Sequence, residues 1–344
     1  MACGSAAAIV AALALLAATS PLPPPVTTPI DPGTAESLRL LVGKDLRVAT
    51  IAFRLQTAAA DHCPDHTRLS GLIVQDASQY SAALRPALAV LYGMTDLPTV
   101  TAVVKGSPAA AAGIGAGDAI VAVDGFGLAA DLPMAAGRAP DGRRFTAMID
   151  RLDTAFAAGP ATLVLRRADQ ERTVTVTGAT ACRSAVQLDL SDRRNASADG
   201  HVVTVTQGIA DFTPSDDELA FVIGHELAHD ILGHRAYLDG THTSRGMVAG
   251  LGGNGARLRA TERQADYFGV YLLAWAGYDP HAAAHFWRRM AHADPLGSLF
   301  ADGTHPGYGA RVRALARAAD EIDAERAAGR PVVPDGAAFA AAVG

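Results

Sequence analysis

The chain has 344 residues, which is long enough for two domains with separate cores. Hydrophobic residues make up 49% of it and charged residues 19%, a balance typical of a globular protein, so intrinsic disorder is excluded. The 29 basic and 35 acidic residues give a net charge of −6, and there is no run of Lys or Arg. A nucleic-acid-binding surface is therefore not expected.

The N-terminal segment differs from the rest of the chain. Residues 6–18 form an unbroken apolar run, and a Pro-rich linker follows at 21–34. This pattern predicts that residues 1–20 are a signal peptide or a weak N-terminal anchor. We therefore expect export to the periplasm or cell envelope, with peripheral membrane attachment if the segment is retained.

Two cysteines, Cys63 and Cys182, follow this segment. In an exported protein an even pair favours a disulfide. Two buried free thiols are the alternative, and the sequence leaves both open.

The middle of the chain changes from helical to strand periodicity. Residues 35–85 are expected to be a helical part of the domain that resumes at residue 179, with one helix over about 35–60. Residues 86–178 then alternate as strands around one helical stretch. The expected strands and helix are 99–104, 119–123, 145–158 (the helix), 161–167 and 172–177.

The segments Gly106-Ser107-Pro108-Ala109 and Gly117-Asp118-Ala119-Ile120 make residues 86–178 resemble a bacterial PDZ domain. The resemblance implies that a peptide C-terminus adds as a strand beside the long helix, with its carboxylate held by a Gly-containing loop. The segment that best matches this loop is Leu91-Tyr92-Gly93-Met94. Peptide binding and a purely structural or regulatory insert are both left open.

The segment His225-Glu226-Leu227-Ala228-His229 carries the H-E-x-x-H pattern. On a helix, positions i and i+4 share a face, so the two imidazoles can bind one metal ion. Glu226 can then take a proton from a water activated by that ion. Ser215 to Glu218 fits a capping box that begins this helix, and the apolar run 219–224 predicts that the helix is buried. Isolated His and Glu side chains are costly to bury, so the pattern indicates a metal site.

A catalytic zinc ion needs a third protein ligand. His234 is one residue out of the register of a third histidine ligand, which predicts a surface or second-layer residue. Glu262 is the better candidate, on a helix expected over 260–276. Asp266 lies four residues later on the same face, where it can accept a ring N–H from a ligand histidine.

Several blocks together resemble the zinc metallopeptidase family of CAAX prenyl proteases and HtpX-like heat-shock proteases, which are gluzincins. They are Asn195-Ala196, 201–206, 215–220, the H-E-x-x-H segment, Glu262 with Asp266, and Thr304-His305-Pro306 with Arg311.

The resemblance implies one zinc ion per chain, held by His225, His229 and Glu262. It implies that Glu226 is the general base and later the proton donor. It also implies that His305 stabilises the oxyanion and that Arg311 braces the site. A packing role for His305 is the alternative.

We therefore expect an α+β protein: a mainly helical peptidase domain with a small sheet at 179–325, a PDZ-like domain, and a C-terminal tail at 326–344. The Gly-rich segment 246–255 is expected to be a flexible loop, too short to span a membrane. The strand at 201–206 is expected to pair with extended substrate. The expected function is zinc-dependent proteolysis of unfolded or exposed proteins, of a quality-control type. A non-catalytic PDZ-bearing regulator and a zinc amidohydrolase are the alternatives.

Overall fold

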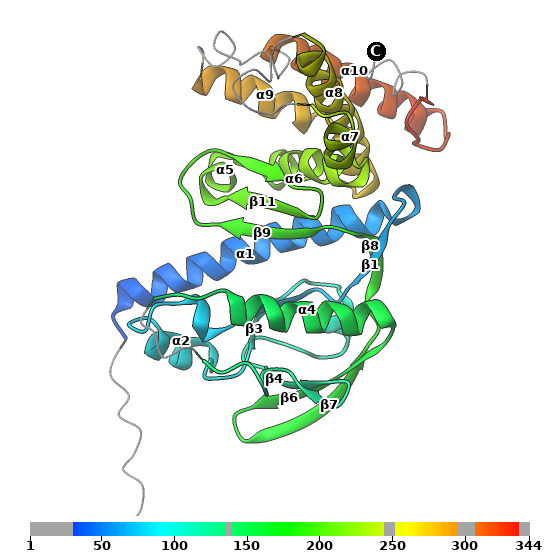
Figure 1. The fold of residues 1–344 in the computed structure, drawn as a ribbon. Coiled ribbons are helices and arrows are strands. Elements are labelled where there is room, and N and C mark those ends of the chain that lie inside the picture. Colours follow the sequence, from blue (N-terminus) through cyan, green and yellow to red (C-terminus); the bar gives the residue numbers. More distant parts are fainter. Residues whose placement is uncertain (1–29, 135–138, 244–251, 295–306, 337–344) are drawn as a thin grey trace, which may run out of the picture.

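The computed structural model describes residues 30–134, 139–243, 252–294 and 307–336, which form two units on either side of a long helix (Figure 1). The described helices are α1 (Pro32–Ala58), α2 (Arg85–Tyr92), α3 (Pro108–Ala111), α4 (Arg143–Ala158), α5 (Gln207–Phe212), α6 (Asp216–Ile231), α7 (His234–Gly240), α8 (Gly252–Trp275), α9 (Ala282–Ala293) and α10 (Tyr308–Ala327), with short 3₁₀ turns η1 (Ala60–His62) and η2 (Ala77–Gln79). The strands are β1 (His66–Leu69), β2 (Leu72–Gln75), β3 (Thr99–Val103), β4 (Ala119–Val123), β5 (Phe126–Gly127), β6 (Ala161–Arg167), β7 (Gln170–Val176), β8 (Ala179–Cys182), β9 (Ala185–Asp189), β10 (Ala196–Ala198) and β11 (Val202–Thr206). The predicted α+β class is confirmed.

Helix α1 supports both units. Asp31 caps it by accepting a hydrogen bond of 2.8 Å from the Thr34 backbone N–H, and proline opens the first turn, where its missing N–H costs nothing. Near its start, Leu38 packs with α2 and η2. Farther along, Ile51 and Leu55 enter the main core with α6 and α8. The linker predicted over 21–34 therefore overlaps the first turn of this helix.

The sheet unit holds a six-stranded sheet in the order β2-β3-β4-β6-β7, with β5 paired to β4. Its core lies between this sheet and α4, where Ile120, Leu163 and Met148 are fully buried. Strand β2 pairs antiparallel with β3, Leu72 opposite Val103. The predicted domain boundary at residue 86 is therefore wrong, because the sheet begins at Leu72.

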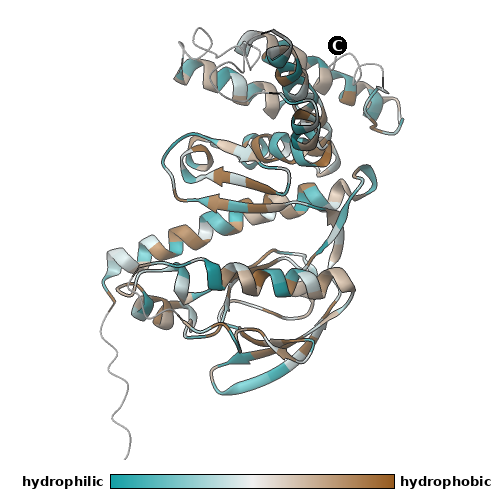
Figure 2. Ribbon diagram, viewed as in Figure 1, coloured by the Kyte–Doolittle hydropathy of each residue, from teal (hydrophilic) through white to brown (hydrophobic). Residues whose placement is uncertain are grey.

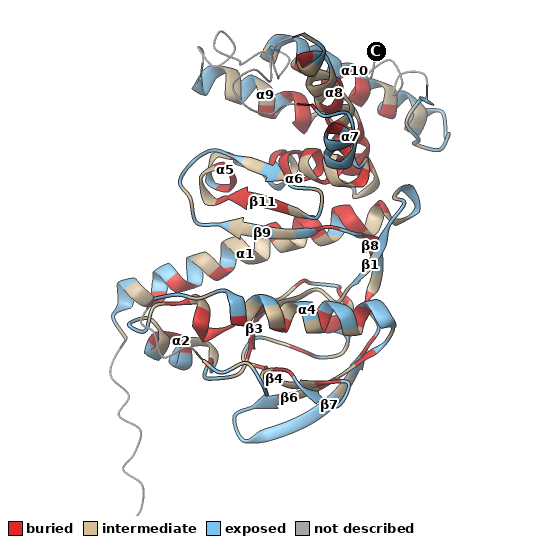
Figure 3. Ribbon diagram, viewed as in Figure 1, coloured by how far each residue is buried: buried red, intermediate tan, exposed pale blue. Residues whose placement is uncertain are grey.

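The helical unit, which comprises α5 to α10 with the sheet β10-β11-β9, packs against the second half of α1. Figure 3 shows α6 and β11 largely buried, whereas the turn joining β6 to β7 in the sheet unit is exposed. Figure 2 shows the matching pattern of hydropathy, with brown residues on β11 and teal ones at that turn. Helix α6 is thus largely buried, as the apolar run 219–224 predicts.

A two-stranded neck connects the sheet unit to the rest of the chain. Strands β1 and β8 pair antiparallel, with His66 opposite Cys182. A disulfide joins Cys63 to Cys182, whose Cα atoms are 5.6 Å apart at a sequence separation of 119. The Gln56 side-chain amide of α1 donates to the carbonyls of Cys182 and Ser184, at 3.0 and 2.7 Å. The two segments that connect the sheet unit to the rest of the chain, β1 and β8, are therefore held together by strand pairing and by a covalent bond.

No helix within the described ranges is both long and apolar enough to cross a bilayer. The predicted signal peptide or anchor at 1–20 lies outside those ranges. So does most of the expected loop at 246–255, although its last residues, from Gly252, belong to α8.

Replacing both bonded cysteines, as Cys63→Ala with Cys182→Ala, should destabilise the protein by about 3 kcal/mol, because the unfolded chain regains the entropy of a long closed loop. Urea unfolding measures the change. Wild type under a thiol reductant should unfold at the midpoint of the double variant. An oxidised wild type that unfolds at the same midpoint as the variant would contradict a stabilising role for the bond.

Candidate active site

Helix α6, which carries the H-E-x-x-H segment, begins with a partial capping box. The Ser215 hydroxyl accepts the backbone N–H of Glu218 at 3.2 Å. The Glu218 carboxylate does not return to the cap; it pairs with Arg289 of α9 at 2.9 and 3.0 Å. Three acidic residues occupy the first turn, where they complement the positive end of the helix dipole. The start of α6 is thereby fixed locally and also tied to α9.

Helices α6 and α8 approach each other closely through two glycines. A Cβ on Gly269 would lie 3.3 Å from the backbone nitrogen of His225, and one on Gly224 would lie 3.5 Å from the Gly269 carbonyl oxygen. Larger residues at this contact would push the helices apart. The contact brings Glu262, two turns earlier on α8, to the face of α6 that carries the two histidines.

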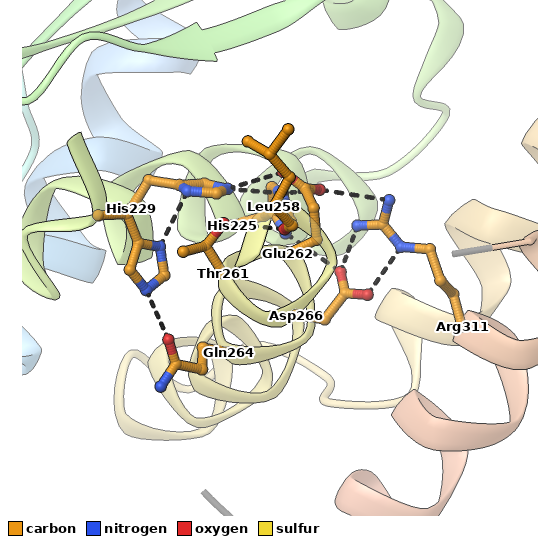
Figure 4. A network of polar contacts seen from close by, with 9 residues as sticks. His225, His229, Leu258, Thr261, Glu262, Gln264, Asp266 and Arg311 are labelled. Atoms are coloured by element: carbon orange, nitrogen blue, oxygen red, sulfur yellow. Dashed lines mark hydrogen bonds and ion pairs between the residues drawn. The ribbon is translucent and has the colours of Figure 1, made fainter. Parts of the chain in front are cut away.

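The three predicted metal ligands lie together (Figure 4). His225 Nε2 and His229 Nε2 are 3.3 Å apart, and each is 3.5 Å from a carboxylate oxygen of Glu262. The edges of a tetrahedron of ligands around zinc measure about 3.3–3.6 Å when each ligand is about 2.0–2.2 Å from the ion. These nitrogen and oxygen donors therefore fit a zinc ion in both type and spacing, with one position left for substrate or water.

Asp266 and Arg311 brace the ligands from behind. Asp266 Oδ1 lies 3.1 Å from His225 Nδ1, and Arg311 of α10 donates two hydrogen bonds to the same carboxylate at 2.7 and 2.5 Å. The guanidinium also lies 3.7 Å from Glu262 and stacks over the Trp287 ring. Burial alone would raise the pKa of Asp266, but Arg311 and His225 hold it below its usual range. The carboxylate is therefore charged, and it can fix the His225 ring with Nε2 toward the metal position.

The electrostatics around His225 favour a cation. Burial lowers the pKa of His225, but the Asp266 and Glu262 carboxylates outweigh that effect and raise it to about 10. A proton held so firmly between two carboxylates occupies a place where a metal cation would be stabilised for the same reason.

His234 is buried beside the site, which settles the choice between a surface and a second-layer position. Its Nδ1 lies 3.0 Å from Nδ1 of His229, and its Nε2 lies 3.0 Å from the Gln264 side-chain oxygen. The sequence did not indicate Gln264, because it faces a different side of α8 from Glu262 within the same turn and matches no ligand pattern.

Glu226 lies in a cleft of about 460 Å³ beside the three ligands. Burial raises the pKa of Glu226 to about 7, while nearby His225 opposes the rise. A carboxylate with its pKa near neutrality can both accept and return a proton. The cleft is also lined by β10 with the two residues before it, by four aromatic side chains, and by a few other residues: Arg194, Asn195, Ala196, Ser197, Ala198, Phe221, Phe286, Trp287, Tyr308, Ile209, Val222, Met290 and Arg311.

The expectation that the strand at 201–206 pairs with substrate is wrong. Strand β11 lies in the middle of its sheet, with β10 on one side and β9 on the other, so both of its edges are taken. Strand β10 is the edge strand that lines the cleft. It was missed because three residues, Ala196–Ala198, give too short a strand pattern.

The expectation of a carboxylate-binding loop at Leu91-Tyr92-Gly93-Met94 is also wrong. Gly93 is the left-handed C-cap of α2, and its N–H donates to the Ala89 carbonyl at 2.9 Å. The Met94 N–H donates to the Leu88 carbonyl at 3.4 Å, and the Met94 side chain is buried. These N–H groups close a helix and are not available to a peptide. His305, the expected oxyanion residue, lies outside the described residues.

Comparison with known proteins bears on this site directly. Residues 170–249 and 245–319 match the family model described as peptidase family M48. This part of the chain is therefore similar to peptidase family M48. The match includes His225, Glu226, His229 and Glu262, and it supports the expected zinc metallopeptidase over a non-catalytic regulator.

Two similar proteins are both named mitochondrial metalloendopeptidase OMA1. The one from Schizosaccharomyces pombe is 29% identical over 147 residues, which are 37% of this chain and 44% of that protein. The one from Arabidopsis thaliana is 32% identical over 141 residues, 35% of this chain and 28% of that protein. The chain thus spans less than half the length of the curated relatives it matches.

One solved structure, the HtrA3 PDZ domain bound to a phage-derived ligand (FGRWV), covers 34% of this chain and 89% of its own, at 18% identity and a TM-score of 0.25. Similarity this low carries no argument about the sheet unit. The PDZ-like identity of residues 86–178 therefore stays a prediction.

Replacing the glycine of the helix contact, as Gly269→Val, should force α6 and α8 apart and separate Glu262 from the two histidines. We expect a loss of about 1–3 kcal/mol of stability from the overpacking. We also expect loss of most bound zinc, measured by elemental analysis of the purified protein. The matched control is Gly43→Val on α1, where an added Cβ meets nothing within 4 Å. Equal zinc content in both variants would refute this role for the glycine.

Proposed function

We propose that the chain is an endopeptidase that uses one zinc ion per molecule to cleave peptide bonds in unfolded or exposed protein segments. The observation that carries the proposal is the convergence of His225, His229 and Glu262 beside Glu226 in an open cleft. A structural metal site is normally closed by four protein ligands and has no use for an adjacent carboxylate. The cleft and Glu226 therefore favour catalysis over a purely structural metal.

The residues of the site divide the chemical work. Zinc, when bound, supplies a Lewis acid that polarises the scissile carbonyl and acidifies water. Glu226 accepts the proton of the attacking water and returns it to the leaving amine, for which a pKa near neutrality is suited. Asp266 and Arg311 keep His225 oriented, because they form a buried charged pair joined by two hydrogen bonds.

The substrate enters as an extended strand along β10. This strand pairs on one side with β11, and it lines the cleft that contains the metal ligands. A peptide added antiparallel or parallel to an edge strand gains main-chain hydrogen bonds whatever its sequence. Only segments that are not already folded can present their backbone in this way, which supports a quality-control role.

The site of action is the cell envelope or another oxidising compartment outside the cytoplasm. The disulfide between Cys63 and Cys182 supports this, because such bonds persist mainly in oxidising compartments. The apolar run at residues 6–18 supports export as well. Mass spectrometry of the protein recovered from fractionated cells identifies its N-terminus and its compartment. A reduced protein found only in the cytoplasmic fraction would refute export.

A second peptide partner binds between the two units. A cavity of about 700 Å³ lies there, lined by α1, by α4 and by the segment from β1 to β2. Among the described strands, β2 lies at the end of its sheet and pairs with β3 alone, so its outer edge is available to an added strand. We therefore assign peptide binding to this cavity and the edge of β2, and not to the loop Leu91-Tyr92-Gly93-Met94 that the sequence suggested.

Glu226→Gln should lower the cleavage of casein by a factor of about 10²–10⁴ while zinc content stays at the wild-type level, because only the proton-transfer group is lost. Removing zinc with a chelator should abolish cleavage by the wild type, and added zinc should restore it. If Glu226→Gln cleaves casein as fast as wild type, the proposed mechanism is wrong.

Ile149→Arg should weaken the binding of a fluorescein-labelled casein peptide to the Glu226→Gln protein at least tenfold, because the new side chain fills the cavity beside α4. Fluorescence anisotropy measures the affinity. Ala158→Arg, at the exposed end of the same helix, serves as the control and should bind as before. If both arginine variants bind the peptide equally well, the cavity is not the second peptide site.

A further inference from the structure

Two side chains behind the metal ligands, Gln264 of α8 and His234 of α7, form a hydrogen-bonded chain that ends on the ligand His229 of α6. Gln264 Oε1 lies 3.0 Å from Nε2 of His234, whose Nδ1 lies 3.0 Å from Nδ1 of His229 (Figure 4). On its other side, Nε2 of His229 faces His225 and Glu262 at 3.3 and 3.5 Å. The imidazole of His229 therefore has its two nitrogens in different surroundings.

We propose that Gln264 and His234 are positioning residues that set the tautomer of His229, so that its Nε2 lone pair is free to bind metal. The inference rests on the proposed zinc site, and it assigns a role to two residues outside the ligand set. The proposal is about which ring nitrogens of the neutral His234 and His229 carry a hydrogen.

The contact between His229 and His234 has room for one hydrogen. Two ring nitrogens 3.0 Å apart share a single N–H, so one ring donates and the other accepts. A doubly protonated His234 would point an N–H at His229 and force Nδ1 of His229 to be the acceptor. A neutral His229 would then carry its proton on Nε2, where a metal ligand needs a lone pair.

The side-chain oxygen of Gln264 selects the productive direction. It accepts the N–H of His234 Nε2, which leaves Nδ1 of His234 without a proton. That nitrogen can only accept, so His229 donates from Nδ1 and keeps Nε2 unprotonated. The reverse direction would begin with the amide nitrogen of Gln264 and end with a proton facing His225 and Glu262.

The placement of these residues suits this role. His234 is buried at 4% exposure, so water does not readily replace either of its partners. Gln264 and Glu262 lie two residues apart on α8, so the helix that supplies the carboxylate ligand also supplies the oxygen that orders the histidines. His225 and His229 are thus oriented by different means, the first by a charged aspartate and the second by a neutral amide.

The test is a double-mutant cycle on zinc affinity, measured by competition with a chelating dye. Gln264→Leu should weaken zinc binding by about 10–100-fold, as is usual when a group that orients a ligand is lost. His234→Asn should bind close to wild type, because its side-chain oxygen can take the position of Nδ1 and always accepts. Gln264→Leu should then cost nothing further in the His234→Asn background, because an amide oxygen needs no help to be an acceptor.

Gln187→Leu, the same change at an exposed position on β9, is the matched control and should leave zinc affinity unchanged. The inference is overturned if Gln264→Leu binds zinc like wild type, or if it costs the same in both backgrounds, as a purely structural role would.

Nitrogen chemical shifts of ¹⁵N-histidine-labelled wild type, recorded without zinc, provide a second readout. The Nδ1–H tautomer of His229 with the Nε2–H tautomer of His234 is expected, and the reverse pair overturns the inference. A wild type that shows these tautomers but binds no zinc would contradict the proposed function alone.

Discussion

The site depends on one steric constraint, the backbone contact between α6 and α8 at Gly224 and Gly269. Without side chains at these positions the two helices touch main chain to main chain, and residues two turns away can meet across the gap. The close approach of the helices places Glu262 within 3.5 Å of His225 and His229. From the same stretch of α8, Asp266 contacts His225 and Gln264 contacts His234. The three ligands, together with Asp266 and Gln264, therefore belong to one helix pair.

The buried carboxylates of this helix pair are stabilised by a positive charge from a third helix. Arg311 brings a positive charge from α10 to the Asp266 and Glu262 carboxylates, and its flat face stacks on Trp287. Since an unpaired buried carboxylate is costly, α10 is as necessary to the site as the helices that carry ligands. Trp287 of α9 also lines the cleft, so the same stacking joins Arg311 and its two carboxylate partners to the cleft wall.

The metal-binding face could be predicted from sequence because helical spacing fixes it locally. His225 and His229 share a face at i and i+4, and Glu262 and Asp266 repeat that spacing on the next long helix. The contact between His234 and Gln264 could not be predicted, because it depends on how α7 packs on α8. Strand β2 was missed because Leu72–Gln75 is short and does not alternate. Gly93 was misread because a glycine after an apolar helix fits a helix cap as well as a binding loop.

The disulfide between Cys63 and Cys182 has a consequence for how the protein withstands backbone cleavage. Cys63 and Cys182 bracket the sheet unit, so any single backbone cut between them leaves two fragments that are still covalently joined. The exposed turn between β6 and β7 is the kind of site where such a cut would fall. A nicked molecule would keep α1 linked to the metal-binding helices, and its active site would survive damage to the part of the chain most open to attack.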